Sequence, residues 1–115
     1  MTDQEYSDYP PKTCEIDRLV THPRLIAAAL SGQKTQQRRN GVYAYPGETF
    51  MLDSVRFVIT ALERKSLGEM TDADAKAEGF PDLETYKQLI ISMHKGMEWD
   101  DQHLVWVHSF EKTDT

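Results

Sequence analysis

The stretch that organises the chain is Gly32-Gln33-Lys34-Thr35-Gln36-Gln37-Arg38-Arg39. It follows an alanine-rich helical pattern and contains one lysine, two arginines and no apolar side chain beyond its first glycine. A buried strand would carry apolar residues at alternate positions, and this stretch has none. Two interpretations are therefore open: a solvated edge strand whose charges discourage edge-to-edge pairing, or a ligand site.

Length and composition indicate one soluble globular domain. The chain has 115 residues, of which 39% are hydrophobic and 28% charged. No apolar run approaches the ~20 residues of a membrane span, and the acidic amino terminus lacks a secretory signal. Cys14 is the only cysteine, so no intrachain disulfide can form. The sequence therefore predicts a cytoplasmic protein with no membrane partner.

Charge is unevenly distributed along the chain. The net charge is −6, yet no acidic residue lies between Asp17 and Glu48. Five basic residues fall in that interval, which leaves 8 basic and 19 acidic residues elsewhere, or −11. This pattern favours an anionic or polar ligand held locally over a protein that coats nucleic acid through charge alone. The five are Arg18, Arg24, Lys34, Arg38 and Arg39.

Periodicity and capping signals predict the secondary structure and the domain boundaries. We expect a poorly ordered tail over residues 1–14 and a single domain over 15–112. Thr21, His22 and Pro23 are typical of a helix start, and Thr71 with Asp74 resembles a capping box. The predicted strands are 15–20, 49–52, 55–62 and 104–110, and the predicted helices are 22–31, 71–78 and 82–95, with Gly96 ending the last.

The order of these elements predicts the fold class. Helices and strands do not alternate regularly, which disfavours a parallel doubly wound sheet. The strand over 55–62 is β-branched and apolar on both faces, as expected where a small sheet closes on itself. We therefore expect an α+β protein: a small mixed β-barrel with about three helices packed on it.

The polar residues show few of the spacings that carry known chemistry. The four histidines and Cys14 lack metal-ligand spacing, and no phosphate-binding glycine loop is present, so we expect no metal and no cofactor. His108 alternates with Trp106 and Phe110, which favours a hydrogen-bonded, partly buried histidine. Glu78 lies in the last turn of its helix, where the helix dipole disfavours a negative charge, so it needs a partner or solvent.

In combination, these residues resemble the ASCH domain family. Gly32, Lys34, Gln37 and Arg39 follow its signature Gly-x-Lys-x-x-Glu-x-Arg, with glutamine in place of glutamate. The resemblance covers roughly residues 16–112. Further matches are Pro46-Gly47-Glu48, the strand over 57–62, the segment over 71–80, and the closing Val105-Trp106-Val107-His108-Ser109-Phe110.

The resemblance implies a fold and a site. ASCH domains share a β-barrel fold similar to the RNA-binding PUA domain, and one clade hydrolyses N4-acetylcytidine. That clade uses a lysine, a threonine three residues later and a downstream glutamate. By position, Lys34 and Glu78 are the expected catalytic residues, and Gln37 replaces the threonine. Glutamine offers neither a hydroxyl nucleophile nor a charged base. The expected substrate-binding residues are Thr35, Gln37, Arg38, Arg39 and Tyr43.

Strand alternation refines this expectation. Gln37 and Arg39 share a parity and should face one side, and Lys34 precedes the strand and could turn toward the same cleft. We expect Glu78 to pair with Lys34 or Arg39. A solvated Lys34–Glu78 pair would contribute only about 0–1 kcal/mol, so Lys34→Ala should fold.

Three classes of function remain. The leading one is recognition of a nucleoside or RNA base in a polar cleft, with hydrolysis of an amide such as N4-acetylcytidine as its enzymatic form. The alternatives are a non-catalytic RNA-binding module and a protein-interaction domain. The sequence leaves the oligomeric state open.

Overall fold

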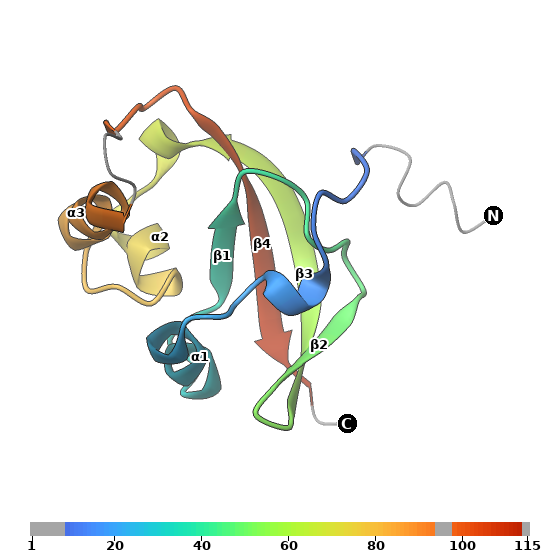
Figure 1. The fold of residues 1–115 in the computed structure, drawn as a ribbon. Coiled ribbons are helices and arrows are strands. Elements are labelled where there is room, and N and C mark those ends of the chain that lie inside the picture. The colour runs from blue at the N-terminus through green and yellow to red at the C-terminus, as the bar shows by residue number, and fades with distance from the viewer. Residues whose placement is uncertain (1–8, 94–97, 114–115) are drawn as a thin grey trace.

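The computed structural model of this chain describes residues 9–93 and 98–113. Within them, four strands form one antiparallel sheet in the order β1-β4-β3-β2, with helices beside it (Figure 1). The strands are β1 (Gln36–Arg39), β2 (Thr49–Leu52), β3 (Val55–Ser66) and β4 (Leu104–Lys112). The helices are η2 (Ile16–Arg18), α1 (Pro23–Leu30), η3 (Leu67–Glu69), α2 (Asp72–Ala77) and α3 (Leu83–Met93).

The sheet is curled into a half-barrel. Its two long central strands, β3 and β4, pair along most of their length, and their register shifts between Ile59 and Ala61. Such an irregularity bends the strand and increases its twist. In Figure 1 both strands sweep across the molecule, with β1 and β2 at opposite edges. The predicted α+β class and barrel-like sheet are confirmed.

The main core fills the hollow of the half-barrel. Phe50, Phe57 and Phe110 pack against one another, with ring centroids 5.5–5.8 Å apart. Leu19 and Ala29 cover them from the side of η2 and α1. Helix α1 carries apolar residues at every third or fourth position, and these form one apolar stripe. With this stripe α1 can close one side of the half-barrel.

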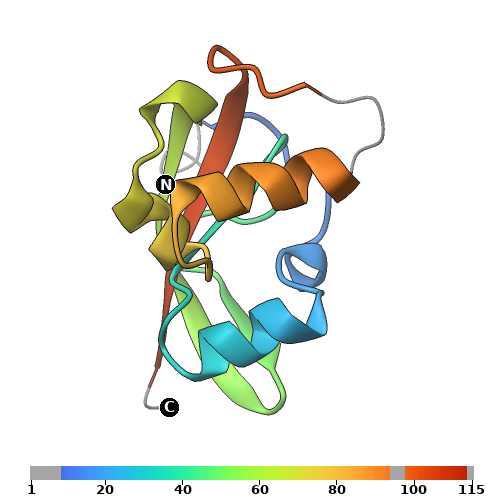
Figure 2. The same ribbon diagram turned by 90° about the vertical axis from the view of Figure 1, so that its left-hand side faces the viewer.

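A second, smaller apolar cluster holds α2 and α3 together. Met70, Ala75 and Tyr86 are buried there, and Phe80 meets Tyr86 edge to face at 5.1 Å. Figure 2 shows α1 and α3 on the same side of the sheet, with α2 beside them. This arrangement leaves β1 at a sheet edge flanked by two helices.

Most predicted elements are confirmed, with differences at their ends. The strand predicted over 15–20 is wrong, because this segment forms the short helix η2. Strand β3 runs beyond the predicted 62 to Ser66, because its charged end still pairs with β4. Helix α1 is capped by the His22 ring, which accepts a hydrogen bond from the Arg24 N–H. The predicted stop at Gly96 lies outside the described residues.

The described part of the amino-terminal segment lies against the domain. Of the predicted tail over residues 1–14, residues 1–8 are outside the described part of the chain. Tyr9 stacks on Tyr45 with ring centroids 5.8 Å apart, and the Thr13 N–H donates to the loop between β1 and β2. Among the described residues, no helix has the length and apolar character needed to span a membrane.

His108 links this loop to the sheet from a fully buried position. Its Nε2 accepts a hydrogen bond from the Tyr43 N–H at 3.0 Å, so Nδ1 carries the proton and donates to the Gln37 carbonyl at 3.2 Å. Burial lowers the pKa of His108 to about 4, outweighing the hydrogen bonds that raise it. The predicted hydrogen bonding of His108 is confirmed, although the residue is fully and not partly buried, and it is neutral at pH 7.

This histidine should make the protein less stable in mild acid. Between pH 6.5 and about 4 the unfolded chain binds a proton at His108 that the folded chain does not, so stability falls as the pH falls through this window. At ~1.4 kcal/mol for each pH unit, the full effect is about 3 kcal/mol. Urea unfolding at pH 7 and pH 4.5 measures it, with His108→Gln as the variant that lacks this contribution.

The imidazole itself provides a second readout. Its ¹⁵N chemical shifts at pH 6 should show the neutral ring with the proton on Nδ1. A protonated His108 at that pH, or equal pH dependence in the wild type and His108→Gln, would contradict the assignment.

Candidate ligand-binding cleft at the edge of the sheet

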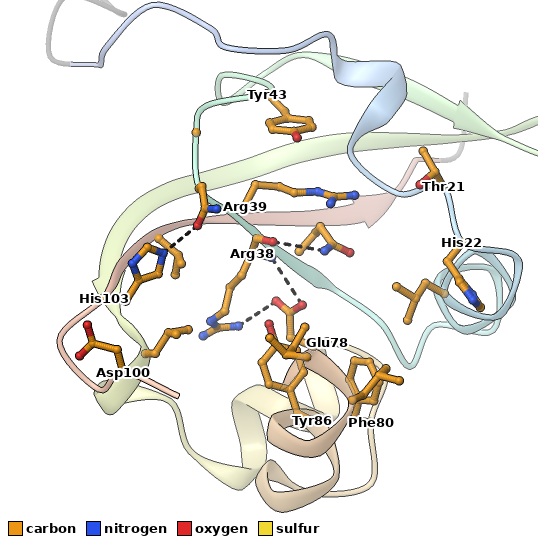
Figure 3. Close-up of a pocket in the computed structure, with 18 of the residues that line it drawn as sticks. Thr21, His22, Arg38, Arg39, Tyr43, Glu78, Phe80, Tyr86, Asp100 and His103 are labelled. Atoms are coloured by element: carbon orange, nitrogen blue, oxygen red, sulfur yellow. Dashed lines mark hydrogen bonds and ion pairs between the residues drawn. The ribbon is translucent and has the colours of Figure 1, made fainter. Parts of the chain in front are cut away.

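A cleft of about 830 Å³ runs along the free edge of β1. Its walls come from α1 and the segment before it on one side and from α3 and the start of β4 on the other (Figure 3). Leu25, Phe80 and Tyr86 supply apolar and aromatic surface, whereas Arg38 and Glu78 supply charge. Its volume falls within the range of small-molecule sites.

At the free edge of β1, side chains make the backbone hydrogen bonds that a further strand would otherwise make. Lys34 Nζ donates to the Gln36 carbonyl at 2.6 Å. The Arg38 N–H donates to Glu78 Oε1 at 3.4 Å, and Gln37 Nε2 donates to the Arg38 carbonyl at 3.3 Å. An edge strand with unpaired backbone groups would invite pairing with another chain. Here the edge is occupied by buried polar side chains, not by the solvated charges that one interpretation expected.

Glu78 is the centre of a buried ionic cluster. Its Oε2 accepts from Arg38 Nη1 at 2.8 Å, and its Oε1 lies 3.6 Å from Lys34 Nζ. The Glu78 and Lys34 residues are each 1% exposed, and Arg38 is 7% exposed. Asp74 Oδ1 lies 3.8 Å from Arg38 Nη2. The partner that Glu78 needed at its helix end is therefore supplied by two cations from the β1 region.

Lys34 is buried behind the cleft and does not line it. Its Nζ also donates to the Glu78 carbonyl at 2.9 Å, so two of its protons are held by backbone oxygens. Burial lowers the pKa of Lys34, while the charge of Glu78 and the hydrogen bond with it act in the opposite direction. The expectation that Lys34 faces the cleft with Gln37 is wrong, because the residue turns inward under α2.

Arg39 has a different role from the one predicted. Its guanidinium donates to the Leu19 carbonyl at 2.7 Å and to the Arg18 carbonyl at 3.1 Å, and it lies over the Tyr43 ring at 5.2 Å. Of the two partners expected for Glu78, Lys34 does lie beside it, at 3.6 Å. Arg38 takes the place expected of Arg39, because the opposite parity points Arg38 toward α2 (Figure 3). Arg39 and Tyr43 still line the cleft, as expected for binding residues.

Gln37 lines the cleft, and Thr35 does not. The Thr35 side chain is exposed, and its backbone joins α2 to β4 through hydrogen bonds with Ala77 and Phe110. Gln37 is 8% exposed, and its Oε1 has no hydrogen-bond partner among the described residues. The structure thus brings Gln37, Arg38, Arg39, Tyr43 and Glu78 to one cleft and leaves Lys34 and Thr35 outside it.

Tyr86 also lines the cleft, although no sequence pattern assigns it to the site. It lies on the packing face of α3, where an aromatic residue is most simply read as core. Burial and the nearby Glu78 charge raise the pKa of its hydroxyl, so it remains a neutral phenol. In Figure 3 its ring lies directly below Glu78. No sequence signal distinguishes this tyrosine from a purely structural one.

Comparison with known proteins supports the fold. No protein-family model matches the sequence, and no curated protein matches it significantly. An ASCH domain structure from Lactobacillus crispatus JV V101 is similar, with a TM-score of 0.62 and 14% identity over 76% of this chain and 69% of that one. A protein from Enterococcus faecalis V583 with the family model DUF984 has a TM-score of 0.58 and 18% identity, over 97% and 82% of the two chains. The chain therefore has a fold similar to that of an ASCH domain.

The chemistry of the cleft suits binding of a planar polar ligand. Among the described residues no group of three or more His, Cys, Asp or Glu side chains could hold a metal ion. Apolar walls can cover the faces of a ring, while Gln37, Arg38 and Glu78 can meet the polar groups at its edge.

Removing Lys34 should destabilise the protein strongly, in contrast to the expectation for a solvated pair. Lys34→Met keeps the length of the side chain but leaves the buried Glu78 with one cation fewer and two backbone carbonyls without a donor. Breaking a buried ion pair from one side costs about 3–5 kcal/mol. The free energy of unfolding in urea measures this.

The control is Lys76→Met, at an exposed lysine on the neighbouring helix. It should change the unfolding free energy by less than ~0.5 kcal/mol. Equal effects of the two substitutions would show that the Lys34 interactions contribute little.

Proposed function

We propose that the protein binds a nucleoside or an RNA base in the cleft beside β1. The observation that carries this proposal is the pairing of aromatic and apolar walls with the buried polar groups of Gln37, Arg38 and Glu78 in one cleft of about 830 Å³. A nucleobase has the matching properties, because its ring faces are apolar and its edges carry hydrogen-bond donors and acceptors. The ASCH fold, similar to the PUA domain, agrees with this class of ligand.

The distribution of charge favours a single base as the ligand over a long nucleic-acid strand. Two arginines of the basic segment have internal partners: Arg38 pairs with Glu78, and Arg39 donates to backbone carbonyls. They are therefore poorly placed to neutralise phosphates along a strand. Arg18 and Arg24 are exposed, but the net charge of the chain is −6. Recognition at the cleft thus depends on the base more than on the backbone of the nucleic acid.

A substitution that fills the cleft should abolish binding. Leu89 and Ile91 are both 39% exposed on α3, but only Leu89 is among the residues that line the cleft. Leu89→Trp should weaken nucleoside binding at least about tenfold, or ~1.4 kcal/mol, whereas Ile91→Trp should leave it unchanged. Titrations with adenosine, guanosine, cytidine, uridine and N4-acetylcytidine, followed by NMR shifts of the Tyr43 and Tyr86 signals, provide the measurement. Failure of all five nucleosides to bind would refute the proposal.

Amide hydrolysis is the second candidate, and one observation favours it: Glu78 lines the cleft and could hold a water. Lys34 weighs against it, because its ammonium group bonds two carbonyls behind the cleft. Gln37 weighs against it as well, because it cannot act as a hydroxyl nucleophile. We therefore expect a binding protein, not a hydrolase.

Cytidine release from N4-acetylcytidine decides between these functions. The wild type and Lys34→Met should both release cytidine no faster than a protein-free control. If a threonine is the missing nucleophile, Gln37→Thr should release it above that background. Release by the wild type that Lys34→Met loses while still folded would replace the binding proposal with a hydrolase.

A further inference from the structure

The polar groups of the cleft also indicate which base edge it accepts, an inference that rests on the proposed function. In an extended strand the N–H and C=O of one residue point to the same side. At Arg38 both point away from β4, where the Glu78 carboxylate takes the N–H and the Gln37 amide takes the carbonyl. The Gln37 and Glu78 side chains therefore lie next to each other along the edge of β1.

The orientation of the Gln37 amide follows from its hydrogen bond. Only the NH₂ end can donate to the Arg38 carbonyl, so the end left over is the oxygen, an acceptor. This oxygen is buried and has no partner among residues 9–93 and 98–113. A buried acceptor without a donor is costly, and a ligand that supplies the donor removes that cost.

The neighbouring groups extend the pattern. Glu78 Oε1 faces both the Arg38 N–H and the Lys34 ammonium group, whereas Oε2 accepts one hydrogen bond, from Arg38 Nη1, and a carboxylate oxygen can accept a second. Arg38 Nε is a buried donor that lacks a partner within the described chain. The groups left for a ligand are thus an acceptor on Gln37, a neighbouring acceptor on Glu78, and the Nε donor of the Arg38 guanidinium that binds Glu78.

We infer that the cleft selects a base whose edge offers two adjacent N–H donors with an acceptor beside them, which is the edge of guanine. The guanine N1–H and 2-amino group can meet the two acceptors, and O6 can meet the Arg38 donor. Cytosine and adenine each carry a single donor group on the corresponding edge, and uracil places its one N–H between two acceptors. Each of these would leave at least one of the cleft's acceptors without a donor.

Inosine is the sharpest probe, because it differs from guanosine only in lacking the 2-amino group. Isothermal titration of the wild type should show guanosine binding at least about tenfold more tightly than inosine, and more tightly than adenosine, cytidine and uridine. Gln37→Met, which keeps the size of the side chain but removes the oxygen, should reduce the preference for guanosine over adenosine to less than about threefold. Gln33→Met, at an exposed glutamine in the preceding loop, should keep the full preference.

The outcomes separate this inference from the proposed function. Similar affinity for all the nucleosides, or tighter binding of inosine or cytidine than of guanosine, would overturn the guanine inference while nucleoside binding stands. No binding of any nucleoside would overturn both. The comparison of guanosine with inosine uses the wild type alone, so it decides the question even if Gln37→Met does not fold.

Discussion

The structure depends on the burial of one carboxylate, that of Glu78, against the edge of the sheet. A buried charge is tolerated only where opposite charges and hydrogen bonds compensate the loss of water. Arg38 and Lys34 provide both, and the Arg38 N–H adds a bond from the strand itself. Since Glu78 ends α2, this cluster fixes α2 to β1, and α2 in turn positions α3 through their shared apolar cluster. One wall of the cleft therefore depends on this ionic cluster together with the apolar cluster between α2 and α3.

The cleft exists because β1 has a neighbour on only one side. A further strand would have filled this space and used the N–H and C=O of Arg38 in its own hydrogen bonds. Instead Gln37 and Glu78 occupy those groups and keep part of their own hydrogen-bonding capacity. The same side chains thus protect an open sheet edge from pairing with other chains and present polar atoms at the base of a cleft lined by aromatic residues.

Lys34 lies behind the cleft and not among the residues that line it. By its position in the ASCH signature, Lys34 was expected to be a catalytic residue. Its ammonium group instead contacts two backbone carbonyls and the Glu78 carboxylate. In this arrangement the lysine is a structural link between the end of α1, β1 and α2. Glu78, the other residue of the matched pair, does reach the cleft. Similarity of fold alone does not establish the chemistry, so the site has to be judged from its own contacts.

The sequence by itself determined the elements whose causes are local: the Thr71–Asp74 capping box, the helix before Gly32, and the strands with β-branched alternation, together with the α+β class. The sequence also identified residues 32–39 as either an edge strand or a ligand site, and it placed Gln37 and Arg39 on one side of a strand. Only the tertiary structure decided that Arg38, not Arg39, meets Glu78, that Lys34 is buried, and that Tyr86 borders a cleft. Alternation fixes which residues share a face, but not which helix packs on that face. That choice comes from burial of apolar and charged groups between segments some 40 residues apart in the chain, which no local pattern encodes.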